Sequence, residues 1–313
     1  MRRQLSPMPI IELNRIIKNH RIDLVHSQGS RADFFSALAV RINGHSTLIS
    51  TITMLVEGFD VNFLRKTVYR LFDLVKEKTA KHFIVVSETL RQFLIHQKSI
   101  PTQKVVKIHN GIEVNLYNPN AKKGFQYFKS EKNTGKLVIG AIGRLVWQKG
   151  FEYLIEAIPS IAESVPDIKC YVIGDGPLKS KLEQLIIDKN LNDKVRLLGF
   201  RDDINNILSE MHIIVVPSLL EGFPMITLEA MSMARPIVAS RIPGIQEQIE
   251  TEREGILVPP ADSKAIAEAV IRVLRDRKLA EKIGAAAHRK VNRCFTVEKM
   301  IRETENVYLS VLR

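Results

Sequence analysis

The chain has 313 residues, of which 45% are hydrophobic and 26% charged, and its formal net charge is +12. This length favours two ordinary domains over one large one, each able to bury a core. Two cysteines, Cys170 and Cys294, exclude a disulfide framework, and the apolar runs are far shorter than the roughly 18 residues that span a membrane. A reducing, cytoplasmic setting is therefore expected.

The N-terminal part alternates short apolar runs with segments of helical spacing, as chains that form parallel α/β sheets do. Strands are expected at Leu24–His26, Thr47–Ile52, Phe83–Ser87 and Val105–Ile108. We expect this first domain to cover residues 1–120 and a polar linker to cover 121–136.

The densest positive charge lies between Arg65 and Lys81, in a segment whose apolar residues recur at helical spacing. This pattern predicts a basic amphipathic helix that rests on an anionic membrane or an acidic acceptor. The alternative is the solvated helix face of a basic protein. Aromatic residues make up only 6% of the chain, and no base-stacking motif accompanies the charge, so nucleic-acid binding is not expected.

The C-terminal part repeats the alternation more clearly, which predicts a doubly wound parallel sheet with helices on both faces. Its strands are expected at Leu137–Ile142, Ile168–Ile173, Val195–Leu198, Ile213–Val216 and Ile237–Ala239. We expect this second domain to cover 137–295 and a final helix to cover 296–313. Ligands of such sheets bind at the carboxyl ends of the strands, so the loops that follow the strands are the candidate site.

The first such loop runs from Gly143 to Gly150 and opens a helix. Arg144 and Lys149 both lie on it, where an arginine fork and a lysine point charge can converge on a phosphate group. The alternative is two surface cations that flank a turn. The next loop, GDGP at 174–177, has a lysine at position 179 instead of the third glycine of a dinucleotide fingerprint. It predicts a tight turn near a ligand.

The third loop leads from Pro217 into a helix that Pro224 can open, and the unpaired N–H groups of a helix start form an anion site. Glu221 precedes this helix and Glu229 lies inside it. One carboxylate can reach the distal end of a ligand while the other binds vicinal hydroxyls, as a ribose offers. Two glutamates that flank a Gly-Phe-Pro helix start, downstream of the Arg/Lys loop, form a strong constellation.

The chain resembles glycosyltransferase family 4 in the segments GRLVWQKGFEYLIEA, YVIGDGPLKSKLEQL, EGFPMITLEAMSMARPIVASRIPGIQEQI and EGILVPPAD, most specifically between Gly140 and Asp262. The resemblance implies the GT-B architecture, in which two Rossmann-like domains face each other. It also implies a retaining enzyme that uses a nucleotide-activated sugar, often UDP-linked, without a catalytic metal or other cofactor. The sequence contains no D-x-D pair of the kind that metal-dependent sugar transferases use.

The resemblance also implies site residues. It places Arg144 and Lys149 on the donor diphosphate, Glu229 on the ribose hydroxyls and Glu221 against the transferred sugar. The donor-binding set it implies is Gly143, Arg144, Lys149, Gly174, Phe200, Arg201, Glu221, Gly222, Phe223, Pro224, Met225, Thr227 and Glu229. Within that set, the backbone near Phe200 and Arg201 would meet the base.

The N-terminal half departs from the family pattern, because family members usually open with a strand and a glycine-rich loop. About 60–80 residues of an ordinary Rossmann-like half are expected to be missing, which would expose a strand edge and apolar surface. His26 lies in a segment that resembles the family's H-x-H, with Gln28 at the second position, and Thr53 stands where a further histidine is expected. A role of His26 at the sugar or acceptor and a purely structural role both remain open.

Two functions follow. The first is a transferase that moves a sugar to a glycan or lipid-linked acceptor in cell-surface polysaccharide or lipopolysaccharide biosynthesis, with peripheral contact at the inner face of the plasma membrane. The second is a truncated, non-catalytic GT-B protein that binds nucleotide or membrane without turnover. Both predict that UDP or GDP binds to the second domain, and only the first predicts nucleotide release in the presence of an acceptor.

Overall fold

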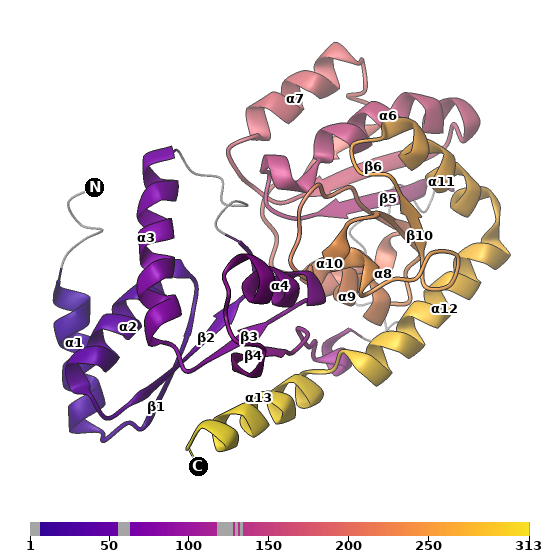
Figure 1. The fold of residues 1–313 in the computed structure, drawn as a ribbon. Helices are drawn as coiled ribbons and strands as arrows, with labels where there is room; N and C mark the ends of the chain where they lie inside the picture. The colour runs from indigo at the N-terminus through magenta and orange to yellow at the C-terminus, as the bar shows by residue number, and fades with distance from the viewer. Residues whose placement is uncertain (1–6, 56–62, 118–127, 129–130, 132–133, 313) are drawn as a thin grey trace. The chain divides into compact units, whose positions relative to one another are not determined.

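The computed structural model describes residues 7–55, 63–117, 128, 131 and 134–312 (Figure 1). The chain forms two compact units, one made of Met1–His109 with Met300–Arg313 and the other of Asn110–Lys299. The units divide at residue 110, whereas the first domain was expected to end at 120. Most of the expected linker at 121–136 lies outside the described residues. The expected final helix is α13 (Val297–Leu312), and most of it belongs to the first unit.

The first unit holds a parallel sheet in the order β1-β2-β3-β4. Besides α13, its elements are α1 (Met8–Asn19), β1 (Leu24–Gln28), α2 (Ser30–Asn43), β2 (Thr47–Ile52), α3 (Phe63–Thr79), β3 (His82–Val85), α4 (Glu88–Gln92), a π-helical turn (Phe93–Gln97), a 3-10 turn (Thr102–Lys104) and β4 (Val105–Lys107). The four expected strands are confirmed to within two residues.

The sheet of the first unit is covered on both faces. Alternate residues of a strand point to opposite faces. On one face, Ile49 of β2 and Ile84 of β3 pack against Val307 and Val311 of α13. On the other, α2 lies over β1 and β2, with α1 and α3 packed beside it. The C-terminal helix thus completes the core of the N-terminal sheet.

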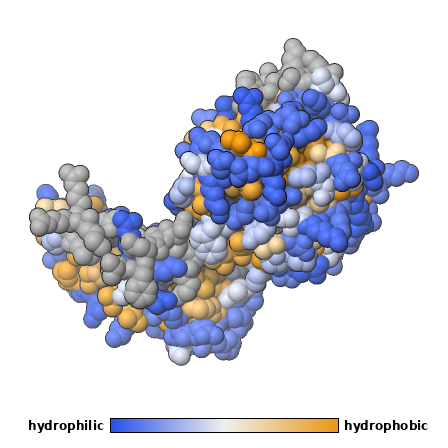
Figure 2. Space-filling view, turned by 90° about the horizontal axis from the view of Figure 1, so that it is seen from above, coloured by the Kyte–Doolittle hydropathy of each residue, from blue (hydrophilic) through white to orange (hydrophobic). Residues whose placement is uncertain are grey.

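The open edge of this sheet is β1, which pairs only with β2 among the described residues. Nearby, α1 exposes Met8, Ile11 and Ile16 to solvent. Figure 2 shows apolar surface on this unit. The described part of the chain therefore has an edge strand at β1 and exposed apolar side chains on α1, while the expected absence of part of the first domain stays a prediction.

The second unit holds a parallel sheet in the order β10-β9-β8-β5-β6-β7. Its elements are a 3-10 turn (Val114–Leu116), β5 (Leu137–Ile142), a 3-10 turn (Trp147–Lys149), α6 (Phe151–Ser164), β6 (Ile168–Ile173), α7 (Lys179–Asp188), β7 (Val195–Leu197), α8 (Ile204–Glu210), β8 (Ile213–Val216), α9 (Met225–Ser232), β9 (Ile237–Ser240), α10 (Pro243–Gln246), β10 (Ile256–Val258), α11 (Ser263–Arg275) and α12 (Arg277–Cys294). The five expected strands are confirmed to within a residue. The short strand β10 was not predicted. Two parallel-sheet α/β units confirm the predicted fold class.

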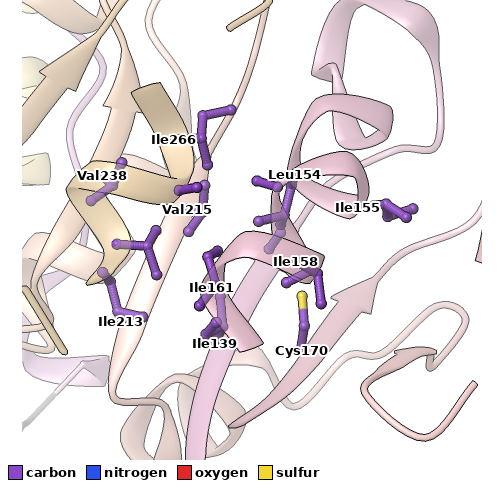
Figure 3. Packing of buried hydrophobic residues seen from close by; sticks show 14 of the residues in the cluster. Ile139, Leu154, Ile155, Ile158, Ile161, Cys170, Ile213, Val215, Val238 and Ile266 are labelled. Carbon is purple, nitrogen blue, oxygen red and sulfur yellow. The ribbon is translucent and has the colours of Figure 1, made fainter. Parts of the chain in front are cut away.

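The core of the second unit lies between the central strands and the helices α6 and α11 (Figure 3). Ile139 of β5 and Val215 of β8 are fully buried, with Leu154 and Ile158 of α6 and Ile266 of α11 packed against them. These side chains are aliphatic because a central parallel strand is covered on both faces. The close packing holds the strand ends, and the loops that leave them, in fixed places.

The described helices bear on membrane crossing, and the buried cysteine bears on disulfide chemistry. None of the described helices is long and apolar enough to cross a membrane. Cys170 is fully buried in the core, and burial raises the pKa of its thiol to about 12. Its thiol is therefore a packing group, consistent with a chain without a disulfide framework.

Gly174 follows β6 at a point where only glycine fits. A Cβ at this position would lie 1.9 Å from the carbonyl oxygen of Gly143, and the φ of Gly174 is +139°. Gly199, which follows β7, also has a positive φ (+72°), but its Cβ would meet nothing within 4 Å. We expect Gly174→Ala to lower the free energy of unfolding by more than about 3 kcal/mol, against about 1 kcal/mol for Gly199→Ala. Urea unfolding measures both, and equal losses would contradict the close approach.

Candidate functional site

The second sheet changes direction at β5. From β5 the chain proceeds to β6 and β7 on one side and then returns to β8, β9 and β10 on the other. The loops after β5 and β8 therefore leave neighbouring strands in opposite directions at the carboxyl edge of the sheet, the position at which open α/β sheets generally bind ligands. Arg144 and Lys149 lie on the first of these loops, and Glu221 lies on the second.

The backbone of one loop is hydrogen-bonded to the other. The N–H groups of Leu219 and Leu220 both donate to the carbonyl of Gln148, at 2.7 and 3.3 Å. Gly150 allows the approach, because a Cβ there would lie 2.3 Å from the Pro217 carbonyl oxygen. The two loops thus form one structural unit.

An ion pair joins the same loops through their side chains. Lys149 Nζ lies 2.6 Å from Glu221 Oε1, and the Ser218 hydroxyl donates to that oxygen at 2.8 Å. The Glu221 side chain is 6% exposed and that of Lys149 22%, so the pair is mostly shielded from water. Arg144 is exposed near the start of the loop. The sequence did not reveal this direct pairing, nor the part played by Ser218.

Helix α9 begins next to the ion pair. Pro224 precedes it with φ −68° and ψ 132°, and among the described residues no side chain caps its first turn. Two amides hold the entry to the helix, since Asn110 Nδ2 donates to the Phe223 carbonyl at 3.0 Å and Gln248 Nε2 donates to the Pro224 carbonyl at 2.9 Å. The N–H groups of the first turn, with the helix dipole, make this point favourable to an anion.

Glu229 lies inside α9 and is half-buried. Burial raises the pKa of its carboxyl group, while a hydrogen bond with Tyr117 lowers it. Two nearby residues pack in the core: Thr227 of α9 is fully buried, and Phe223, which precedes the helix, packs edge-on against Phe295 with 5.3 Å between ring centroids. Met225 is partly exposed at the helix start.

The remaining expected donor residues lie after β6 and β7. Gly174 touches the backbone of Gly143, so these two glycines bring neighbouring loops together. Phe200 is 77% exposed. Arg201 makes two hydrogen bonds of 2.8 Å to the Asp203 carboxylate, which holds the pKa of Asp203 below its usual range. The structure therefore brings together the residues of the β5 and β8 loops, with Phe200 and Arg201 two strands away.

His26 belongs to the first unit. One ring nitrogen, Nδ1, lies 2.5 Å from the Tyr308 hydroxyl of α13, and the other, Nε2, lies 2.7 Å from Thr51 Oγ1. Partial burial lowers the pKa of the imidazole, so the neutral form is favoured. Since both nitrogens are engaged, a ligand that hydrogen-bonds to His26 has to displace Thr51 or Tyr308.

A second polar cluster of the first unit lies at the carboxyl edge of the first sheet, beside a cavity of about 50 Å³. Buried Lys76 donates to Asp73 at 2.8 Å and lies 3.7 Å from Asp33, which also accepts from Ser27 at 2.7 Å. Burial raises the pKa of Asp33, and Ser27 and Lys76 oppose that shift. Within the described residues, no group of three or more His, Cys, Asp or Glu side chains is arranged to hold a metal ion.

The family follows from comparison with known proteins. Residues 122–290, more than half of the chain, match the family described as Glycosyl transferases group 1, and residues 1–116 match Glycosyltransferase Family 4. The chain belongs to the group 1 glycosyltransferases. The resemblance to glycosyltransferase family 4 is confirmed, and the protein is an enzyme of the glycosyltransferase type.

Relatives of this glycosyltransferase act in several settings. It is 28% identical to the UDP-Gal:alpha-D-GlcNAc-diphosphoundecaprenol alpha-1,3-galactosyltransferase of Escherichia coli, over 97% of this chain and 79% of the relative. It is 25% identical to the capsular polysaccharide biosynthesis glycosyltransferase CapM of Staphylococcus aureus, over 93% of this chain and 77% of the relative.

The fold matches solved glycosyltransferases of GT-B architecture. HepE of Anabaena, solved in complex with UDP and glucose, superposes with a TM-score of 0.85 at 23% identity, over 98% of this chain and 82% of HepE. The predicted GT-B architecture is therefore confirmed.

The Lys149–Glu221 pair of this glycosyltransferase also supports its fold. We expect Lys149→Met to lower the free energy of unfolding by about 1–2 kcal/mol, because Glu221 would keep its buried charge without its cation. Arg272 is a matched control, since it bonds Glu252 at 2.6 and 2.7 Å where both side chains are about half exposed. Exposed pairs contribute below about 1 kcal/mol. An equal loss in Arg272→Met, measured by urea unfolding, would argue against a stabilising role of the enclosed pair.

Proposed function

We propose that this glycosyltransferase binds a nucleotide-sugar, UDP-linked in the first instance, at the β5 and β8 loops, and transfers its sugar with retention of configuration. The observation that carries the proposal is the convergence of Lys149, Glu221 and the start of α9 at the switch point of the sheet. The UDP bound to HepE and the UDP-galactose used by the E. coli relative support the choice of nucleotide.

The charges suit a diphosphate leaving group. As the bond between the sugar's anomeric carbon and the phosphate oxygen breaks, negative charge builds on the phosphate and positive charge on the sugar ring. Arg144, Lys149 and the first N–H groups of α9 stabilise the phosphate charge. Glu221 lies beside the sugar, and the acceptor hydroxyl attacks from the face that the phosphate leaves, passing its proton to the departing phosphate oxygen. Glu229 binds the ribose hydroxyls, and the backbone near Phe200 and Arg201 meets the base.

The acceptor is a glycan or a lipid-linked sugar, as the names of the E. coli and S. aureus relatives indicate for those enzymes. The product serves cell-surface polysaccharide or lipopolysaccharide synthesis. His26 and the polar cluster around Asp33 and Lys76 stand at the carboxyl edge of the first sheet, where an acceptor hydroxyl would be received. No cofactor or metal is proposed.

A screen of nucleotides on the purified chain tests the proposal. UDP or GDP should raise the melting temperature, and nucleotide release from the matching sugar donor should require a lipid diphosphate-linked sugar as acceptor. Stabilisation by nucleotide without release would favour the non-catalytic alternative. If neither UDP nor GDP raises the melting temperature, the proposed donor site is contradicted.

The positive charges of Arg144 and Lys149 should account for much of the rate of sugar transfer. We expect Arg144→Ala or Lys149→Ala to slow sugar transfer by about 10²–10³-fold, since each removes a preorganised charge from the leaving phosphate. The assay runs well below each variant's melting temperature, so that lost stability does not enter. Arg253→Ala, which removes a 65% exposed cation, is the control and should keep full activity. Unchanged turnover in either test variant would contradict its assignment.

The enzyme is also proposed to contact an anionic membrane through α3. On its exposed side this helix carries Arg70, Leu71, Leu74 and Lys78, with Leu71 56% and Leu74 49% exposed. Cations beside exposed leucines are typical of helices that lie in a lipid interface. Such contact would bring the active site to a lipid-borne acceptor at the inner face of the plasma membrane.

Vesicle sedimentation tests this contact. We expect Leu71→Asp/Leu74→Asp to reduce binding to phosphatidylglycerol vesicles by at least about fivefold, through lost apolar burial and added negative charge. Ile187→Asp is a matched control, because Ile187 is 52% exposed on α7 of the second unit. If the double variant still binds the vesicles, α3 does not make the membrane contact, and its exposed side is a solvated helix face.

A further inference from the structure

The segment from Asn110 to Tyr117 is fastened beside the start of α9. The N–H of Ile112 donates to the carbonyl of Phe295 at 2.9 Å. The side chain of Asn110 donates to the carbonyl of Phe223, directly before the helix. This segment is therefore attached to the same structure that holds the proposed donor site.

Gly111 makes the path of this segment possible. A Cβ at this position would lie 2.5 Å from the carbonyl oxygen of Thr296, so a larger residue would push the segment away. The 3-10 turn at Val114–Leu116 then redirects the chain, and the N–H of Tyr117 donates to the Val114 carbonyl at 3.1 Å. The position of Tyr117 is thus set by local backbone bonds.

The side chain of Tyr117 is hydrogen-bonded to Glu229. Burial, followed by the neighbouring Glu229 carboxylate, raises the pKa of Tyr117 to about 12. The hydroxyl therefore keeps its proton at neutral pH and is the donor, while the carboxylate accepts. The same bond opposes the rise in the pKa of Glu229 that burial causes.

We propose that Tyr117 is a positioning residue for the donor nucleotide, whose hydroxyl holds the Glu229 carboxylate in the orientation that receives the two ribose hydroxyls. The inference rests on the proposed function, since it assigns Tyr117 to a site whose ligand is proposed above. It adds a residue from outside the β5 and β8 loops.

The chemistry of a carboxylate explains why a fixed partner matters. An ionised carboxylate has about four acceptor positions, of which the tyrosine hydroxyl occupies one. The others are left for the vicinal hydroxyls of a ribose, which donate together only when the carboxylate plane faces them. A carboxylate free to rotate would have to be ordered as the nucleotide binds, which reduces affinity.

Removal of one hydroxyl tests this role. Tyr117→Phe keeps the ring and deletes the donor. Isothermal titration should show UDP, or GDP if the enzyme prefers it, binding about 3- to 10-fold more weakly. The 2′,3′-dideoxy form of the same nucleotide should bind the variant and the wild type with affinities within about twofold, because it has no ribose hydroxyls for Glu229 to accept.

Tyr171→Phe is the matched control. Tyr171 also donates its hydroxyl to a glutamate, Glu131, in the same unit, but on β6. Loss of this bond should leave the affinities for both forms of the nucleotide unchanged. In a Glu229→Gln background, Tyr117→Phe should have little further effect on UDP binding.

The outcomes separate the two proposals. If Glu229→Gln abolishes the preference for the ribose form while Tyr117→Phe leaves it intact, the donor site stands and the role of Tyr117 is overturned. If Tyr117→Phe weakens the ribose and dideoxy nucleotides equally, Tyr117 is only structural. If the wild-type chain binds neither UDP nor GDP, both proposals fall.

Discussion

The proposed donor site of this glycosyltransferase depends on two loops that leave neighbouring strands in opposite directions and are held together by hydrogen bonds. The loops after β5 and β8 diverge because the chain changes direction at β5. The Gln148 carbonyl of the first loop accepts hydrogen bonds from the N–H groups of Leu219 and Leu220 of the second, and the Lys149–Glu221 ion pair also connects the two loops. The ion pair lies on a frame of backbone hydrogen bonds and so does not have to order the loops itself.

The frame is rigid for reasons of packing. Ile139 of β5 and Ile213 of β8 are fully buried in the core that α6 covers, so the strands have little freedom. Glycines at 150 and 174 let the loops approach to distances that a Cβ would forbid. A site that stabilises developing charge needs its dipoles and cations in place before the reaction, and a close-packed frame of this kind supplies that order.

The first unit uses polar groups differently. Lys76 is buried between Asp73 and Asp33, and both ring nitrogens of His26 are engaged by Tyr308 and Thr51. Most of these groups satisfy one another inside the unit, whereas Arg144 is exposed and, among the described residues, no side chain caps the first turn of α9. This contrast agrees with the proposed roles of the units, in which the second binds a charged donor and the first receives a hydroxyl-bearing acceptor.

Local pattern was enough to predict the alternation of strands and helices, the parallel sheets, and the loops that carry Arg144, Lys149 and Glu221, because apolar periodicity and helix-start chemistry depend on neighbours in the chain. Contacts between residues far apart in the sequence were decided only by the tertiary structure. Helix α13 packs on the first sheet, and Lys149 forms an ion pair with Glu221. Tyr308 is hydrogen-bonded to His26, and Tyr117 to Glu229. Tyr117 and Glu229 are 112 positions apart in the sequence. No periodicity links two such residues, and only the packing of the whole unit brings a hydroxyl to a carboxylate over that separation.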